Sequence, residues 1–139
     1  MGEPLRGVSG VAYLVRVSGE DTGGEIAVVE CVLEPGALGA APHTHHGHAE
    51  HVLDVSGEVT VVEGHDEVAV GPDGWVSAPR GVRHGCSTVG EVPAVLRTVV
   101  TPAGYERYFR EIDALVRSRR EPGPEELAAI RSACRTDSG

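Results

Sequence analysis

The sequence predicts an all-β fold, a sandwich or barrel of short antiparallel strands, followed by α-helices at the C-terminal end. Short runs rich in β-branched residues recur along the first hundred residues, and clusters of glycine, proline and aspartate separate them. After Thr101-Pro102 the apolar residues change to a spacing of three and four, which is typical of a helix. A chain of 139 residues is the usual size for one compact domain.

The β-rich runs define the strands that we expect, each bounded by residues that can reverse an antiparallel strand. The expected strands are Val11 to Val17, Glu25 to Leu33, Glu50 to Val55, Val59 to Val62, Glu67 to Val70, Trp75 to Ala78 and Val92 to Val100. Trp75 is the single tryptophan, and we expect it in the barrel core, with a substrate platform as the alternative.

The C-terminal part predicts two helices. The first has one apolar face made by Tyr105, Tyr108, Phe109, Ile112, Leu115 and Val116. This face can cover the barrel or join a partner subunit, and we expect burial against the barrel. Pro122-Gly123-Pro124 ends that helix, and a shorter one starts at Glu125, with acidic residues at its favourable N-terminal end. We expect the tail from Arg135 to fray.

These elements predict one domain in three parts. Residues 1–24 form an N-terminal strand and turn, residues 25–101 form the barrel core, and residues 102–139 form the helical extension.

Histidines crowd the run from His43 to His51, which holds five of the seven in the chain. An accidental histidine-rich loop is one interpretation. The spacing favours another, because His43 and His45 share one face of an extended strand and can bind the same ion. Glu50 follows five residues later, and His84 comes from a distant segment after a tight turn. We therefore expect folding to assemble a metal site from separate segments.

The pattern Gly39-Ala-Ala-Pro-His43-x-His45-x4-Glu50-x6-Gly57, followed by Pro79-x-Gly81-x2-His84, resembles the two motifs of the germin-like cupins. The resemblance covers roughly residues 25 to 101. It implies a cupin-type double-stranded β-helix, a jelly-roll barrel, with C-terminal α-helices. It also implies His43, His45, Glu50 and His84 as ligands of one metal ion, and a homodimer. Two positions depart from the family pattern, Asp73 in place of a glycine and Thr88 in place of an asparagine, and neither is a ligand.

Three imidazoles and one carboxylate suit one divalent transition metal ion, and Fe, Mn, Ni, Co, Cu and Zn all remain candidates. Such an ion can polarise a bound oxygen or acidify a bound water. The alternative is a vestigial set whose histidines only hydrogen-bond one another. His46, His48 and His51 fall outside the motif, so we expect each at the surface or beside a ligand, with His48 the best substitute ligand.

Further polar residues are candidates for the pocket. Asp54 shares the parity of Glu50 and would face inward, either as a catalytic acid or base with a raised pKa or as a carboxylate paired with an inner arginine or histidine. Cys86 shares the parity of His84, and we expect a small apolar filler there. Arg80, Arg83 and Arg97 could meet an anionic substrate or form salt bridges outside.

Composition excludes several classes of function. The net charge of −9 argues against a nucleic-acid partner, and the absence of lysine excludes a lysine Schiff base. No apolar stretch approaches the roughly 20 residues of a membrane span. Three scattered cysteines and no hydrophobic signal segment after Met1 lead us to expect a cytoplasmic protein.

The remaining function classes all act on a small molecule. We favour a metal-dependent oxygenase of the quercetin-dioxygenase type, with Asp54 as the candidate catalytic residue. The alternatives are a redox-neutral isomerase, cyclase or lyase in a bacterial biosynthetic pathway, and a module that binds a small ligand without turnover. The fold alone does not choose among them.

Overall fold

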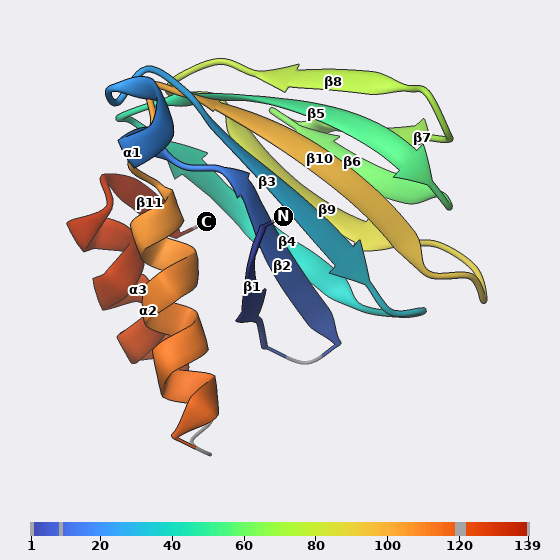
Figure 1. The fold of residues 1–139 in the computed structure, drawn as a ribbon. Helices are drawn as coiled ribbons and strands as arrows, with labels where there is room; N and C mark the ends of the chain where they lie inside the picture. The colour runs from blue at the N-terminus through green and yellow to red at the C-terminus, as the bar shows by residue number, and fades with distance from the viewer. Residues whose placement is uncertain (1, 9, 119–121, 139) are drawn as a thin grey trace.

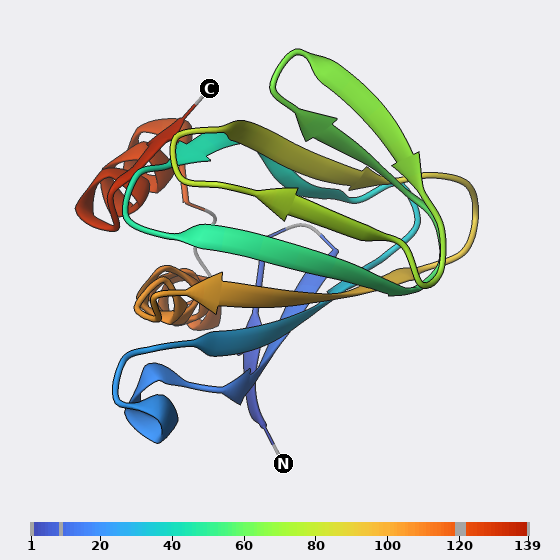
Figure 2. The same ribbon diagram turned by 90° about the horizontal axis from the view of Figure 1, so that it is seen from above.

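A computed structural model describes residues 2–8, 10–118 and 122–138 of the chain. These residues form two antiparallel sheets that face each other as a jelly-roll barrel (Figures 1 and 2). In spatial order, one sheet holds β1 (Glu3–Arg6), β2 (Val11–Val17), β3 (Ala27–Leu33), β10 (Ala94–Thr101), β5 (Ala49–Ser56) and β8 (Trp75–Ala78). The other holds β11 (Thr136–Ser138), β4 (Leu38–His45), β9 (Arg83–Thr88), β6 (Val59–Glu63) and β7 (Asp66–Val70). The predicted fold class is confirmed.

The core lies between the two sheets, where alternate side chains of each strand point inward. Leu33, Val59 and Ala94 are among its fully buried members. Trp75 is not, and the expectation of a core tryptophan was wrong, since this residue is 60% exposed. The reason is the pleat of β8, which turns Val76 and Ala78 toward the interior and Trp75 outward.

Each strand expected from the β-rich runs is present, with ends that differ by at most two residues. The strand β4 was harder to predict because its sequence, LGAAPHTH, contains few strand-forming residues. Its ladder with β9 is irregular between Leu38 and His43, which accommodates Pro42 without a backbone donor at that position.

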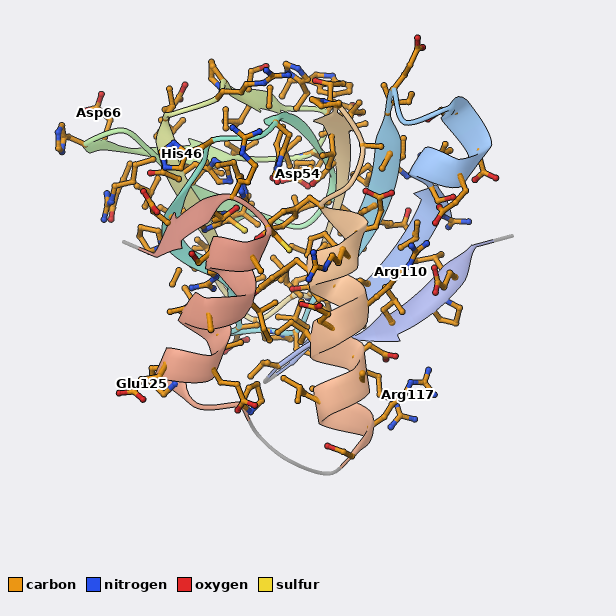
Figure 3. All side chains as sticks on the ribbon, turned by 90° about the vertical axis from the view of Figure 1, so that its left-hand side faces the viewer. His46, Asp54, Asp66, Arg110, Arg117 and Glu125 are labelled. Atoms are coloured by element: carbon orange, nitrogen blue, oxygen red, sulfur yellow. The ribbon has the colours of Figure 1, made fainter. Side chains whose placement is uncertain are left out.

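The helices are α1 (Gly19–Thr22), α2 (Glu106–Arg117) and α3 (Pro124–Ala133). Helices α2 and α3 lie side by side across one end of the barrel (Figure 3). The apolar face of α2 is buried there, with Tyr105, Tyr108 and Ile112 packed against Ala27 and Val100 of the barrel strands. The expected burial against the barrel is thus confirmed. Among the described residues, the helices lack the length and the apolar composition that a membrane-spanning helix requires.

A buried acid fixes the start of α2. Glu106 accepts hydrogen bonds from the backbone amides of Gly104 at 2.6 Å and of Gly19, the first residue of α1, at 2.8 Å. This carboxylate therefore joins the helix that covers the barrel end to the N-terminal segment.

The described part of the C-terminal tail, residues 135–138, turns back and forms a strand, contrary to the expectation that it would fray. Arg135 adopts a left-handed backbone conformation (φ 56°) that turns the chain back after α3. The chain then forms β11, which pairs with β4 in the register Thr136 with His45. The ladder satisfies the backbone groups of both segments, which explains why the tail is held.

Candidate metal centre

The barrel brings the four predicted ligands together from three strands. His43 and His45 lie on the same inward face of β4, as the alternation of a strand requires. His84 lies on β9 directly opposite His43, and Glu50 lies on β5 of the facing sheet. Strands β4 and β9 approach closely next to His84, where Gly85 lies. A Cβ at this position would lie only 2.7 Å from the carbonyl oxygen of Ala40, so glycine permits the close approach.

The functional atoms of these residues converge. Nε2 of His45 lies 2.9 Å from Nε2 of His43 and 2.9 Å from Oε2 of Glu50. Nε2 of His84 lies 3.6 Å from Oε1 of Glu50. The imidazole rings of His43, His45 and His84 have centroids 4.5 to 4.8 Å apart. The structure thus gathers the predicted residues at one place, and their role as ligands stays a prediction.

A fifth residue, His48, joins them. It is buried, and its Nε2 lies 2.7 Å from Oε2 of Glu50. We call His43, His45, His48, Glu50 and His84 the His–Glu cluster. Of the two places expected for His48, the structure thus shows the one beside a ligand. Its spacing of two residues from Glu50 was the available signal, because such residues share a face in extended backbone.

The other two histidines of the run lie outside the cluster. His46 is exposed and contacts Asp137 at 2.7 Å, at the outer edge of the barrel (Figure 3). His51 contacts the hydroxyl of Ser77 on the outer side of β5.

Burial keeps the imidazoles of His43 and His45 neutral. Desolvation, reinforced by the nearby His84 and His45, lowers the pKa of His43 to about 3. Desolvation also lowers the pKa of His45. Burial alone would raise the pKa of Glu50, but hydrogen bonds with His45, His48 and His84 outweigh it and hold that pKa well below the usual value. At neutral pH His43 and His45 are therefore neutral imidazoles and Glu50 is a carboxylate, the ionisation states that bind a metal ion.

The residues of the cluster could hold a cation. Nδ1 of His43 lies 2.6 Å from the carbonyl oxygen of Ala41, which can only accept, so the proton is on Nδ1 and Nε2 carries a lone pair. A proton on Nε2 of His45 can form a hydrogen bond to Nε2 of His43 or to Oε2 of Glu50, but it cannot form a full hydrogen bond to both at once. Nδ1 of His84 is buried and makes no hydrogen bond to any described residue. A divalent ion would satisfy the converging lone pairs, and this donor set suits a transition metal.

Four members of the cluster, His43, His45, Glu50 and His84, lie in the wall of a cavity inside the barrel. Aliphatic residues of both sheets line most of it, among them Val29, Val52, Val61, Val76 and Leu96. Tyr13 and the α2 aromatics Tyr105, Tyr108 and Phe109 also line it, as does Arg131 of α3. The ring of Tyr105 contacts that of His45, with centroids 4.5 Å apart. The cavity is therefore mainly apolar, with the donor atoms on one side.

Burial keeps four further groups of the cavity protonated at neutral pH, namely the thiols of Cys31 and Cys86 and the phenols of Tyr13 and Tyr105. Burial raises the pKa of Cys86 to about 11 and also raises that of Cys31. Burial likewise raises the pKa of Tyr13 and of Tyr105 well above the usual phenol value. Cys86 faces inward, as strand parity predicted, as a neutral thiol that fills space.

Asp54 lies apart from the cluster. It is 1% exposed, in agreement with the predicted inward orientation, but it is not among the residues that line the cavity. It follows Glu50 by four positions along β5, a distance of about 13 Å. Neither carboxylate oxygen has a hydrogen-bond partner of normal geometry among the described residues, so the expected arginine or histidine partner is missing there. Burial, assisted by Glu58, raises the pKa of Asp54.

The arginines singled out from the sequence also lie elsewhere. Arg97 pairs with Glu30, Arg83 donates to the carbonyl oxygen of Gly64, and Arg80 is exposed. The arginine that reaches the cavity is Arg131, which lies over the ring of Tyr108 with 5.8 Å between the guanidinium carbon and the ring centroid. Its spacing of four from Leu127, which packs in the same helical core, was the sequence signal.

A protein-family model described as Cupin domain matches residues 29–108. The comparison with curated proteins found no match. Among solved structures, the fold is similar to KdgF from Halomonas sp., with 18% identity, 75% of this chain and 90% of that chain covered, and a TM-score of 0.66.

Two further solved structures are similar. A sugar phosphate isomerase of the cupin superfamily from Silicibacter pomeroyi has 25% identity, with 73% of this chain and 68% of that chain covered and a TM-score of 0.60. A predicted oxalate decarboxylase from Thermotoga maritima has 18% identity, with 73% of this chain and 92% of that chain covered and a TM-score of 0.65. The two structures at 18% identity indicate a shared fold and nothing about function.

Proposed function

This chain belongs to the cupin family, and from that premise we propose that it is a metal-dependent enzyme acting on a small, mainly apolar organic molecule. In this proposal His43, His45, Glu50 and His84 hold one divalent transition metal ion. The single observation that carries the proposal is the convergence of Nε2 lone pairs and a carboxylate in the wall of an apolar cavity.

When bound, the ion would supply Lewis-acid or redox chemistry at a substrate oxygen. The chain's own residues supply the rest. The aliphatic walls and the rings of Tyr105 and Phe109 exclude water and pack against an apolar substrate skeleton. The neutral phenol of Tyr105 can donate a hydrogen bond but does not ionise at neutral pH.

Proton transfer in the cavity depends on Glu50, the only carboxylate among the described residues that line it. Its Oε2 contacts both His45 and His48, whereas its Oε1 has only the longer contact of 3.6 Å to His84. Oε1 is therefore the more accessible atom to take a proton from a substrate hydroxyl. With Asp54 outside the cavity, we assign no proton transfer to that residue.

Among the possible reactions, we favour an oxygenase of the quercetin-dioxygenase type. The apolar walls suit an organic substrate with an apolar skeleton that presents oxygen atoms to the donor side of the cavity. A sugar phosphate would require a concentration of cationic side chains, and Arg131 is the one arginine among the described residues lining the cavity. A redox-neutral isomerase, cyclase or lyase is the second candidate, because the sugar phosphate isomerase is similar at 25% identity.

The test uses untagged protein reconstituted separately with Fe²⁺, Mn²⁺, Ni²⁺, Co²⁺, Cu²⁺ or Zn²⁺ and incubated with a panel of flavonols and other hydroxylated aromatic compounds. We expect oxygen uptake coupled to substrate loss with at least one redox-active metal. Product formation without oxygen, including with Zn²⁺, would contradict the oxygenase proposal and support a redox-neutral isomerase, cyclase or lyase. Saturable ligand binding without product under both conditions would support a binding module and overturn the enzyme proposal.

A further inference from the structure

The last strand of the chain contacts the candidate metal centre. After α2 and α3 cross the end of the barrel, β11 returns to pair with β4, which carries His43 and His45. In this register Thr136 lies opposite His45. Its hydroxyl oxygen lies 2.7 Å from Nδ1 of His45, and Thr136 is only 2% exposed. Two residues 91 positions apart thus meet in a buried hydrogen bond.

We infer that Thr136 is a positioning residue for His45. Its hydroxyl holds the imidazole ring of His45 so that Nε2 points into the His–Glu cluster. The inference rests on the proposed role of His45 as a metal ligand. A histidine that binds a metal through Nε2 must carry its proton on Nδ1, and this proton needs an acceptor. The hydroxyl of Thr136 is the acceptor in contact with Nδ1, and it can donate its own hydrogen bond to the carbonyl oxygen of Cys134, 3.4 Å away. The phenol of Tyr105 also hydrogen-bonds with this hydroxyl.

The same hydroxyl can also form a hydrogen bond with the other neutral tautomer of His45. When Nε2 of His45 carries the proton and donates to Glu50, Nδ1 becomes an acceptor and the Thr136 hydroxyl can donate to it. Threonine can therefore keep the ring in place with or without an ion, which a side chain that only accepts or only donates could not do. The equivalent contact of His43 is made by a backbone carbonyl of its own strand, Ala41. The ring of His45 depends instead on the C-terminal strand.

The chain offers matched variants for a test. Thr136→Val removes the hydroxyl and keeps the branched shape that suits a strand, whereas Thr136→Ser keeps the hydroxyl. Asp137 is the control on the same strand, because it contacts the exposed His46 and not the cluster. Asp137→Asn therefore tests whether a change in β11 alone affects the centre.

Two measurements apply to each variant: the dissociation constant for Zn²⁺ alone, and the histidine ring ¹⁵N and ¹H shifts by NMR with and without Zn²⁺. We expect Thr136→Val to weaken Zn²⁺ binding about 10- to 100-fold and to shift the His45 signals in the metal-free protein. Thr136→Ser and Asp137→Asn should stay close to the wild type. Thermal unfolding of the metal-free proteins checks that each variant is folded.

If Thr136→Val binds Zn²⁺ as tightly as the wild type and leaves the His45 signals unchanged, the inference is wrong. Equal weakening in Thr136→Val and Asp137→Asn would also overturn it, because the effect would then belong to the strand and not to the hydroxyl. Failure of the wild type to bind any of the six metals would instead overturn the proposed function. The metal-free NMR comparison would still decide whether Thr136 positions the ring.

Discussion

Nε2 of His48 lies 2.7 Å from Oε2 of Glu50 inside the barrel, although His48 falls outside the ligand motif. The same carboxylate oxygen lies 2.9 Å from Nε2 of His45. Glu50 is therefore held between two histidines, one inside the motif and one outside it. A second group that orients a ligand carboxylate is a common arrangement around protein metal ions, and it affects metal affinity.

His48 should therefore support Glu50 without being essential for binding. We expect His48→Ala to weaken Zn²⁺ binding about 10- to 100-fold and His48→Gln, which retains a donor group, to weaken it less. Titration calorimetry measures both. His46→Ala is the matched control from the same histidine run, because that side chain is exposed and contacts Asp137. Unchanged affinity in His48→Ala would show that Glu50 needs no such support.

His84 should be indispensable for the metal site. It is the ligand from the distant motif, and without it the cluster loses the donor provided by β9. We expect His84→Ala to lose tight metal binding, as measured by elemental analysis after purification without an affinity tag. The surface variant His65→Ala should keep the wild-type stoichiometry. A His84→Ala protein with unchanged metal content and affinity would point to a self-contained site within residues 43–51.

The metal-free protein should lose stability in acid. The pKa of His43 is lowered to about 3 in the folded state, below the value of roughly 6.5 of an unfolded chain. Between these values the unfolded state binds more protons than the folded state, so the free energy of unfolding falls as the pH drops from 6.5 toward 3. The lowered pKa of Glu50 acts in the same direction below pH 4.5.

Denaturant unfolding of metal-free protein between pH 7 and pH 4 measures this effect. The variant His43→Gln removes one titrating group and should show a shallower decrease over the same range. Equal slopes for His43→Gln and the wild type would contradict the assignment of the acid sensitivity to this buried imidazole.

Asp54 should lower the free energy of unfolding at neutral pH. Burial and the nearby Glu58 raise its pKa, so the folded state binds a proton more readily than the unfolded state. The ionised form is thus disfavoured in the fold, and stability is lost as the pH rises from the unfolded value toward the folded one. We expect Asp54→Asn to raise the free energy of unfolding at pH 7 by about 1 kcal/mol, or roughly 4 °C in Tm.

The gain from Asp54→Asn should shrink as the pH falls from 7 toward 4, because the raised pKa of Asp54 lets the folded carboxylate take up a proton earlier than that of an unfolded chain. Differential scanning calorimetry at both pH values measures it, with the exposed Asp66→Asn as the control. A loss of catalytic activity in Asp54→Asn with unchanged metal binding and stability would restore Asp54 as a candidate catalytic residue.

Periodicity and turn residues were sufficient to predict most of the strands and both long helices. Val11 to Val17 and Trp75 to Ala78 have the predicted bounds because local sequence favours extended backbone there and turn residues flank them. Strand β4 was less visible because its residues Gly39 to Pro42 have low β-propensity and are held by neighbouring strands. The orientation of Trp75 depended on the pleat of an edge strand, which composition does not reveal.

The sequence by itself determined the types and spacing of the donors, because alternation in an extended strand places His43 and His45 on one face wherever that strand lies. Only the tertiary structure decided what surrounds them. It placed His48 against Glu50, moved Asp54 away from the cavity, and brought Thr136 to His45 through a ladder between distant segments. Such contacts depend on strand register and on the path of the chain around the barrel, and these are set by packing of the whole domain.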